Sequence, residues 1–331
     1  MHVSCQEWAA PTCHGPKGDV TRSIVGVDAD RPERTTSGSE EDAAMTSQGT
    51  FLSILTGSFS SPAGENPTVV MMEAAFRHHE IDARYINCEV PAESLGDAVR
   101  GARAMGWAGF HCSLPHKVAV IDHLDGLANS ASIIGAVNCV VMRDGQLIGE
   151  NTDGQGFITS LRTLVDPAGK SIVIFGAGGA ARAIAVEVAL AGVSSVTVVN
   201  RDRSRGEALV ELIKARTPAA ATFAHWDGTY FVSEAADIVV NATPIGMSPH
   251  ADAVPDINLD SLLPTMVVAD VVPNPPDTVF LTQARKQGSK TLDGLGMLVN
   301  QGAMSIRLWT GIDPDPAVMR HALEELFRTS V

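Results

Sequence analysis

A short apolar run that leads straight into a glycine-rich turn constrains the fold of this chain more than any other feature. Residues 171–175 are mostly apolar and β-branched, as expected for a buried strand. The glycines that follow permit a tight turn and let backbone N–H groups approach a pyrophosphate, which the positive end of the next helix also attracts. The strand, turn and helix therefore predict a dinucleotide site. The turn matches the pattern G-x-G-x-x-A, and its predicted cofactor-binding residues are Gly176, Ala177, Gly178, Gly179 and Ala180.

Alternating β-rich and helical runs extend on both sides of this turn. Such alternation is typical of α/β folds. Asp144-Gly145 separates two β-rich runs and favours a hairpin, because glycine tolerates positive φ. We therefore predict an α/β protein with a Rossmann-type, doubly wound parallel sheet and a second α/β domain. The expected strands cover residues 51–55, 83–90, 110–113, 137–142, 146–148, 171–175, 195–199, 237–241, 267–272 and 290–292, and the expected helices of the first half cover 69–79 and 94–105.

Charge and composition exclude several classes of function. The chain has 38 acidic residues against 24 Lys and Arg, and the net charge of −14 repels a polyphosphate backbone, so we expect no nucleic-acid partner. No apolar run approaches the roughly 18 residues of a membrane span, so we expect no membrane partner. The five cysteines form no C-x-x-C pair, which predicts no disulfide framework and a cytoplasmic location. Cys5, Cys13 and His14 lack the second ligand pair of a tetrahedral site, so we expect no metal.

The turn after the next expected strand bears on the choice between NAD and NADP. About 20 residues beyond the glycines, an NAD-binding protein usually places an acid that binds the ribose 2′-hydroxyl. This chain has Asn200 there, followed by Arg201 and Arg205, which could clamp a 2′-phosphate through charge-assisted hydrogen bonds. Asp202 favours NAD instead, because a nearby carboxylate disfavours phosphate. We predict NADP, with NAD as the alternative cofactor.

Five polar motifs occur along the chain that ordinary core packing would not require. They are Ser113-Leu114-Pro115-His116-Lys117, Gly135-Ala136-Val137-Asn138, Glu150-Asn151-Thr152-Asp153-Gly154, Asn241-Ala242-Thr243-Pro244-Ile245-Gly246-Met247 and Asp293-Gly294-Leu295-Gly296-Met297-Leu298-Val299-Asn300-Gln301. In this order they resemble the shikimate dehydrogenase family, over about residues 50–325. The resemblance implies reversible NADP-dependent reduction of 3-dehydroshikimate to shikimate, or the same reaction on a closely related ring hydroxy acid. It also implies a role in the biosynthesis of chorismate and aromatic amino acids.

The resemblance also implies a role for each matching residue. Lys117 would carry the proton, and Asp153 would orient both Lys117 and the substrate hydroxyl. These residue types suit the chemistry, because oxidising an alcohol requires a base and reducing a ketone requires an acid. The family match further implies substrate contacts from Asn138, Gln301 and Ser113 and cofactor contacts from Thr243 and Gly294.

Two departures from the family pattern concern the substrate side. The family opens its first helix with Ser-x-Ser-Pro, where this chain has Asn66 and Thr68, which retain an amide and a hydroxyl for substrate binding. Both residues could equally serve as helix caps. Where the family tends to place a tyrosine, this chain has Pro273, which removes a phenol donor. We therefore expect shikimate to be a poor substrate.

Three residues near Ser113 receive no catalytic role from the sequence. Cys112 would point to the opposite face of a strand from Ser113, which favours a place in the core. His111 and His116 lie near the expected site but have no paired acid and no metal-ligand spacing. We expect both histidines to lie behind the residues that contact substrate.

The family resemblance and the chain length together suggest the domain organisation. We expect a disordered tail over residues 1–48, a substrate-binding domain from 49–152 plus 296–331, and an NADP-binding Rossmann domain from 153–295. A monomer or a homodimer is expected. Two alternatives stay open: a quinate or aminoshikimate-type dehydrogenase that uses NAD, and a cofactor-binding regulatory module without turnover.

Overall fold

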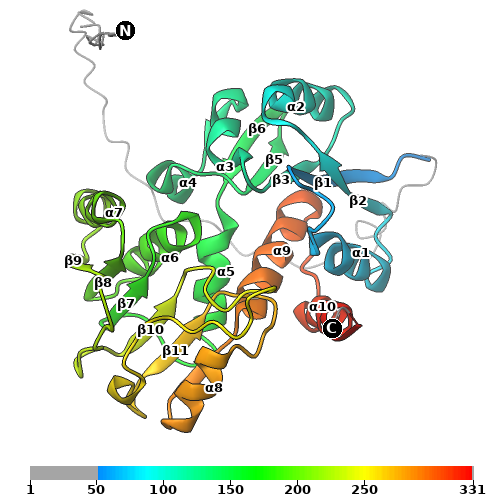
Figure 1. The fold of residues 1–331 in the computed structure, drawn as a ribbon. Coiled ribbons are helices and arrows are strands. Elements are labelled where there is room, and N and C mark those ends of the chain that lie inside the picture. The colour runs from blue at the N-terminus through cyan, green and yellow to red at the C-terminus, as the bar shows by residue number, and fades with distance from the viewer. Residues whose placement is uncertain (1–50, 330–331) are drawn as a thin grey trace, which may run out of the picture. The chain divides into compact units, whose positions relative to one another are not determined.

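The computed structural model describes residues 51–329, in which the strands form two six-stranded sheets (Figure 1). The expected disordered tail, residues 1–48, lies outside the described residues, and so do Cys5, Cys13 and His14. No helix in the described range is long and apolar enough to cross a membrane. The cysteines at positions 88, 112 and 139 are free thiols.

All neighbouring strands of the second sheet are parallel. Their order is β12-β11-β10-β7-β8-β9, so the chain starts in the middle, winds to one edge and then returns to build the other half. This is the doubly wound Rossmann arrangement, and it confirms the predicted fold class. The strands are β7 (Ser171–Phe175), β8 (Ser195–Asn200), β9 (Ala220–His225), β10 (Ile238–Asn241), β11 (Val267–Asp270) and β12 (Lys290–Leu292).

Strand β7 shows how helices cover both faces of this sheet. Its residues alternate between two apolar clusters, with Ile172 and Ile174 on one side and Val173 and Phe175 on the other. Parallel strands buried on both faces read as continuous apolar runs, which is why the sequence revealed β7 so clearly. Strand β9 was not predicted, because alanine has a low strand propensity. The helices next to this sheet are α6 (Gly179–Leu190), α7 (Arg203–Arg216) and α8 (Val279–Lys286), with a 3₁₀ turn at Leu259–Ser261.

The first sheet is mixed. Strand β1 pairs in parallel with β2 and β3, whereas β3, β5 and β6 pair antiparallel. Asp144 and Gly145 both have positive φ, 49° and 77°, so the predicted hairpin between β5 and β6 is confirmed. The order is β2-β1-β3-β5-β6-β4, with bounds β1 (Ile54–Ser60), β2 (Ala83–Glu89), β3 (Gly109–Cys112), β4 (Gly126–Leu127), β5 (Cys139–Arg143) and β6 (Gln146–Glu150).

The first strand lies later in the chain than predicted. Residues 51–55 were expected to form it, but Phe51 and Leu52 are exposed and pairing with β2 begins at Ile54. The strand continues through polar residues that the apolar pattern did not include. Thr56 and Ser58 are fully buried there because their hydroxyls donate to the Arg84 carbonyl and the Asn87 side chain, each at 2.8 Å.

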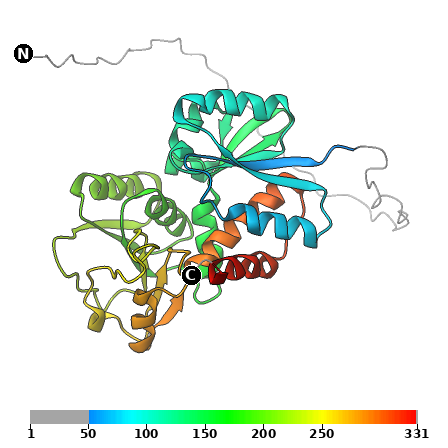
Figure 2. The same ribbon diagram turned by 45° about the vertical axis from the view of Figure 1, so that its right-hand side comes forward.

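Helices α5 (Thr152–Leu161) and α9 (Gly294–Thr310) pack side by side and connect the two sheets (Figure 2). They approach closely because Gly156 has no side chain; a Cβ there would lie 2.7 Å from the Met297 carbonyl oxygen. The predicted domain boundaries at 153 and 296 fall in the first turns of these two helices and stay a prediction. The other helices are α1 (Thr68–His78), α2 (Leu95–Ala104), α3 (His116–Ala119), α4 (Asn129–Ile134) and α10 (Pro316–Thr329), with 3₁₀ turns at Ala92–Ser94 and Val120–His123.

Candidate active site

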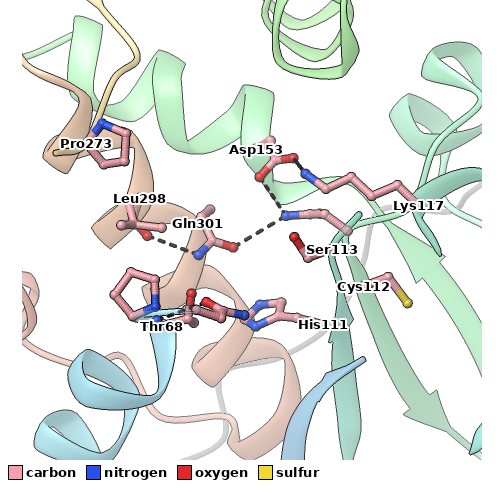
Figure 3. A pocket seen from close by; sticks show the side chains of 12 residues that line it. Thr68, His111, Cys112, Ser113, Lys117, Asp153, Pro273, Leu298 and Gln301 are labelled. Carbon is pink, nitrogen blue, oxygen red and sulfur yellow. Dashed lines mark hydrogen bonds and ion pairs between the residues drawn. The ribbon is translucent and has the colours of Figure 1, made fainter. Parts of the chain in front are cut away.

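One pocket brings together all the residues predicted for catalysis and substrate binding (Figure 3). Its walls come from α1, β3, α3, α5 and α9 and from the segments that follow β3 and β11. It contains about 580 Å³ of empty space, its open mouth included, which suits a small molecule. The lining residues are Asn66, Pro67, Thr68, His111, Cys112, Ser113, Lys117, Asn138, Asp153, Pro273, Leu298 and Gln301.

An ion pair stands at one side of this pocket. Nζ of Lys117 lies 2.6 Å from Oδ2 of Asp153, and the two side chains are 28% and 15% exposed. Lys117 belongs to α3, and its carbonyl accepts a hydrogen bond from Val137 N–H at 2.7 Å, which fixes α3 against the segment before β5. Asp153 lies in the first turn of α5, where the helix dipole favours a carboxylate. The pair therefore presents a proton donor whose position is set by two helices.

Asn138 holds the carboxylate of this pair in place. Its Nδ2 donates to Oδ1 of Asp153 at 2.9 Å, and its Oδ1 accepts from the backbone N–H of Thr152 at 2.7 Å. Asn138 thus ties down both the start of α5 and the Asp153 side chain. Gln301 of α9 lies on its other side, with Oε1 3.4 Å from Asn138 Nδ2 and with Nε2 donating to the Leu298 carbonyl at 3.1 Å.

The end of β3 supplies a hydroxyl to the pocket and a thiol to the core. The backbone N–H of Ser113 donates to the Phe59 carbonyl at 3.0 Å, which places its side chain at the pocket wall. Cys112 is 2% exposed and packs in the apolar cluster beneath this sheet, although it also borders the pocket. Burial raises the pKa of the Cys112 thiol, so no reactive thiolate is available. The buried His116 donates from Nε2 to the Val90 carbonyl at 2.7 Å and serves the packing of α3.

His111 lines the pocket, a place that the sequence reasoning missed. Ser305 donates to the Gln301 carbonyl at 2.8 Å, so its oxygen must accept from His111 Nε2 at 2.7 Å. Nδ1 then accepts from the Tyr85 hydroxyl, also at 2.7 Å. Burial lowers the pKa of His111 to about 3, so the ring is neutral and both nitrogens are engaged. The available signal was its spacing, because residues 111 and 113 share one strand face.

The segment that opens α1 forms the wall where the chain departs from its family pattern. Asn66 Oδ1 accepts from the Thr68 backbone N–H at 3.1 Å, and its Nδ2 lies 3.3 Å from the Ser58 hydroxyl. The Asn66 amide is therefore largely engaged in holding its own turn, although Pro67 occupies the cap position of α1 and no side chain caps this helix. Thr68 is buried but lines the pocket, and Pro273 occupies the facing wall without a donor (Figure 3).

The glycine-rich turn fits a dinucleotide phosphate. Gly176 has φ of +112°, and a Cβ there would lie 2.9 Å from the Ala242 carbonyl oxygen, so the turn requires glycine. A Cβ added at Gly178 or Gly179 would meet no atom of another part of the described chain within 4 Å, so there is open space at the start of α6. No side chain caps α6, and the first N–H groups of a helix lack intrahelical partners. These free donors can bind phosphate oxygens.

In the turn after β8, the acidic residue Asp202 points toward the start of the next helix. Asp202 caps α7, with Oδ1 accepting from the Arg205 backbone N–H at 3.1 Å and Oδ2 lying 3.4 Å from Arg205 Nε. Asp202 therefore serves its own helix, which weakens the argument for NAD. Asn200 donates to the Asp202 carbonyl at 2.8 Å, and the Arg201 guanidinium lies over the Trp226 ring.

The remaining two predicted cofactor residues are Thr243, in the loop that follows β10, and Gly294, the first residue of α9. Thr243 is held by Asn241, whose Oδ1 accepts from the Thr243 hydroxyl at 2.6 Å. Asn241 is itself fully buried and donates to Asp270, so a buried polar cluster supports this loop. Gly294 is required by packing, because a Cβ there would lie 2.4 Å from the Val272 carbonyl oxygen. Cofactor contacts from Thr243 and Gly294 stay predictions.

Comparisons with known proteins agree with this architecture. Three family descriptions match successive parts of the chain: shikimate dehydrogenase substrate binding domain (59–140), shikimate / quinate 5-dehydrogenase (160–248) and shikimate 5′-dehydrogenase C-terminal domain (294–324). Shikimate dehydrogenase (NADP(+)) of Desulforamulus reducens is 39% identical over 273 residues, covering 81% of this chain and 94% of that protein.

Solved structures resemble the chain over similar lengths. The ligand-free 5-ketofructose reductase of Gluconobacter sp. strain CHM43 is 56% identical, with a TM-score of 0.82, and the match covers 84% of this chain and 100% of that one. Shikimate 5-dehydrogenase of Thermus thermophilus, in complex with NADP(H) and shikimate, is 32% identical, with a TM-score of 0.73 and coverage of 82% and 99%.

These similarities extend over both sheets and over the motifs that line the pocket and form the glycine-rich turn. They confirm the predicted family, the predicted fold class and the predicted enzyme class, an NAD(P)-dependent oxidoreductase that acts on a hydroxyl group. The chain belongs to the shikimate dehydrogenase family.

Proposed function

We propose that this chain catalyses the reversible, NADP-dependent reduction of a ketone on a polyhydroxylated small molecule, and that its preferred substrate carries no carboxylate. The pocket carries this proposal. The Lys117–Asp153 ion pair stands beside amides and hydroxyls, and these two are the only charged groups among the described lining residues. Their charges cancel, and the imidazole ring of His111 is neutral.

Lys117 handles the proton in this reaction. NADP(H), when bound, exchanges a hydride with the reacting carbon. In the reducing direction the Lys117 ammonium donates a proton to the ketone oxygen, and in the oxidising direction the amine receives the hydroxyl proton. Asp153 accepts a hydrogen bond from Lys117 and can accept another from the substrate hydroxyl, so it orients both. Asn138 limits rotation of that carboxylate.

The other polar groups of the pocket suit hydroxyls rather than an anion. A substrate hydroxyl both donates and accepts, so it pairs with an amide or a hydroxyl without any net charge. Ser113 and Thr68 offer hydroxyls, and Gln301 offers an amide whose nitrogen donates one hydrogen bond to the Leu298 carbonyl. A carboxylate would instead leave hydrogen bonds unmade, which costs about 1–3 kcal/mol or more for a buried anion.

The cofactor half of the proposal rests on the two nucleotide turns. The first N–H groups of α6, at Gly178 and Gly179, would hold the pyrophosphate. Arg201 and Arg205 would hold the 2′-phosphate, since Asp202 is engaged as a helix cap. NADP is also the cofactor in the name of the Desulforamulus reducens relative and in the Thermus thermophilus complex.

A ketose such as 5-ketofructose is the substrate we favour. The 56% identical Gluconobacter reductase acts, by its name, on 5-ketofructose, which is uncharged. An uncharged ketose matches the cancelled charges of this pocket and the absence of a phenol at Pro273.

A ring hydroxy acid, 3-dehydroshikimate, is the second candidate. Relatives at 34–40% identity carry the name shikimate dehydrogenase (NADP(+)). In this chain the first turn of α1 has no acidic residue and presents Thr68 to the pocket, so its dipole could support a carboxylate. A cytoplasmic location and a monomeric or homodimeric state also stay predictions.

Steady-state kinetics with purified protein test the substrate. We expect kcat/KM with NADPH to be at least about tenfold higher for 5-ketofructose than for 3-dehydroshikimate, from one or more unmade hydrogen bonds to the carboxylate. The opposite ranking would make 3-dehydroshikimate the substrate. Higher rates with quinate and NAD would favour the quinate-type alternative, and no turnover with any ring or ketose substrate would favour the regulatory module.

Variants of the altered wall provide a second test. Replacing Asn66, Thr68 and Pro273 by Ser, Ser and Tyr adds hydroxyl donors toward a carboxylate. We expect the triple variant to improve kcat/KM for shikimate, mostly through KM, because these contacts exist in both ground and transition states. A low micromolar KM for shikimate in the unmodified protein would contradict the preference for an uncharged substrate.

A further inference from the structure

Trp226 forms a rigid platform next to the ribose turn. It follows the last residue of β9, and its backbone N–H donates to the Asn200 carbonyl at 3.1 Å. Trp226 is 5% exposed, and its Nε1 donates to the Asp256 carbonyl at 3.1 Å. The ring also packs edge-on against Phe175, at 5.2 Å between centroids, immediately before the glycine-rich turn. The indole therefore cannot rotate without losing both contacts.

The Arg201 guanidinium rests on this platform. Its central carbon lies 4.9 Å from the Trp226 ring centroid, which is within the range of a cation–π contact. The Arg201 carbonyl accepts from His225 Nε2 at 3.1 Å, so both its backbone and its side chain are held by the end of β9. No carboxylate of the described chain lies within ion-pair distance of Arg201.

The neighbouring arginines differ from Arg201 in this respect. Arg205 pairs with Asp202 at 3.4 Å, and Arg203 pairs with Glu207 at 3.1 Å. A phosphate that binds either of them competes with a carboxylate already in place. Arg201 has no competing carboxylate in the described chain, so its charge and its planar donors are available to an incoming anion.

We propose that Trp226 is a positioning residue that orients Arg201 toward the 2′-phosphate, and that Arg201 rather than Arg205 accounts for most of the selectivity for NADP over NAD. The inference rests on the proposed use of NADP. Trp226 acts through Arg201, because stacking confines a long flexible side chain to one plane and leaves its N–H donors free at the edge. Binding then requires less ordering of that side chain.

Binding of two half-cofactors tests this without turnover. The dissociation constants of 2′,5′-ADP and 5′-AMP, measured by calorimetry, differ only through the 2′-phosphate. Trp226→Leu removes the aromatic face and keeps apolar bulk, so we expect it to weaken the binding of 2′,5′-ADP about 3- to 10-fold. The affinity for 5′-AMP should stay within about twofold. Trp226→Phe retains an aromatic ring, so its affinity for 2′,5′-ADP should stay close to that of the unmodified protein. This variant also keeps the test available if Trp226→Leu does not fold.

A double-mutant cycle links the effect to the arginine. Arg201→Ala should weaken the binding of 2′,5′-ADP at least about tenfold, which is the loss expected for charge-assisted hydrogen bonds. In the Arg201→Ala background, Trp226→Leu should not change the ratio of the two affinities any further, because the side chain it orients is gone. Arg205→Ala should change the ratio less than Arg201→Ala does.

A second arginine–aromatic contact next to the same turn provides a matched control. Arg203 lies over the Phe223 ring at 5.5 Å, but its charge is paired with Glu207. Phe223→Leu should therefore leave the ratio unchanged. Equal weakening of both half-cofactors by Trp226→Leu, or equal ratios for Trp226→Phe and Trp226→Leu, would overturn the positioning role. If Arg201→Ala itself left the ratio unchanged, the proposed 2′-phosphate site would be wrong.

Discussion

The buried, neutral His111 makes a specific prediction about stability and pH. Its ring is 6% exposed, accepts from Tyr85 and donates to Ser305, and burial lowers its pKa from 6.5 to about 3. The unfolded chain therefore binds a proton at His111 below about pH 6.5, whereas the folded chain does not. Acidification between these two pKa values must favour unfolding, so this contribution to stability is complete above pH 6.5 and is lost as the pH falls.

The size of the effect follows from the two pKa values. One pKa unit corresponds to about 1.4 kcal/mol, and pH 5 lies about 1.5 units below the ordinary pKa of histidine. His111 should therefore reduce the free energy of unfolding by about 2 kcal/mol between pH 7 and pH 5. Replacing it with glutamine, which does not titrate, should abolish this part of the pH dependence.

Urea unfolding at about pH 5 and about pH 7 measures this contribution. The stability advantage of the unmodified protein over His111→Gln should be about 2 kcal/mol smaller at the lower pH. His250→Asn, at an exposed histidine, is the control and should show no such change. If the advantage of the unmodified protein over His111→Gln were the same at both pH values, the burial of a neutral ring would not be what determines its protonation.

Three further predictions concern the proton carrier, a packing glycine and a buried acid. Lys117→Ala should lower kcat by about two to four powers of ten and leave the NADPH dissociation constant unchanged, and Asp153→Asn should also lower kcat. Single-turnover kinetics measure both effects. Unaltered rates would refute the roles assigned to these two residues. Gly294→Ala should destabilise the protein by at least about 1–3 kcal/mol in thermal unfolding, because its Cβ would lie 2.4 Å from a carbonyl oxygen. Burial raises the pKa of Asp270 from 3.8 to about 6, so the folded chain binds the extra proton and stability falls as the pH rises through this window. Between about pH 4 and pH 7, the advantage of the unmodified protein over Asp270→Asn should therefore shrink by up to about 3 kcal/mol in urea unfolding, and a constant difference would contradict this.

Local signals made much of the fold predictable. The β7 strand and its glycine turn follow from apolar, β-branched residues and from glycines that accept φ values other residues resist. Asp144-Gly145 specified its hairpin for the same backbone reason. The family motifs then suggested seven pocket residues from Asn66 to Gln301, and folding places all seven around one pocket.

Other features depend on contacts between distant parts of the chain, which no local pattern contains. The polar half of β1 is buried only because β2 supplies acceptors for its hydroxyls. His111 is neutral because the fold buries its ring, while Tyr85 and Ser305, the latter 194 residues away, engage its two nitrogens.

The difference has one physical reason. Backbone preferences and apolar periodicity act over a few residues, so the sequence by itself determined the fold class, the nucleotide turn and the family motifs. The charge state, tautomer and orientation of a side chain depend on what surrounds it in three dimensions. The tertiary structure alone therefore decided that the pocket has balanced charge, that His111 is uncharged, and that Arg201 lies on Trp226 without a carboxylate partner in the described chain.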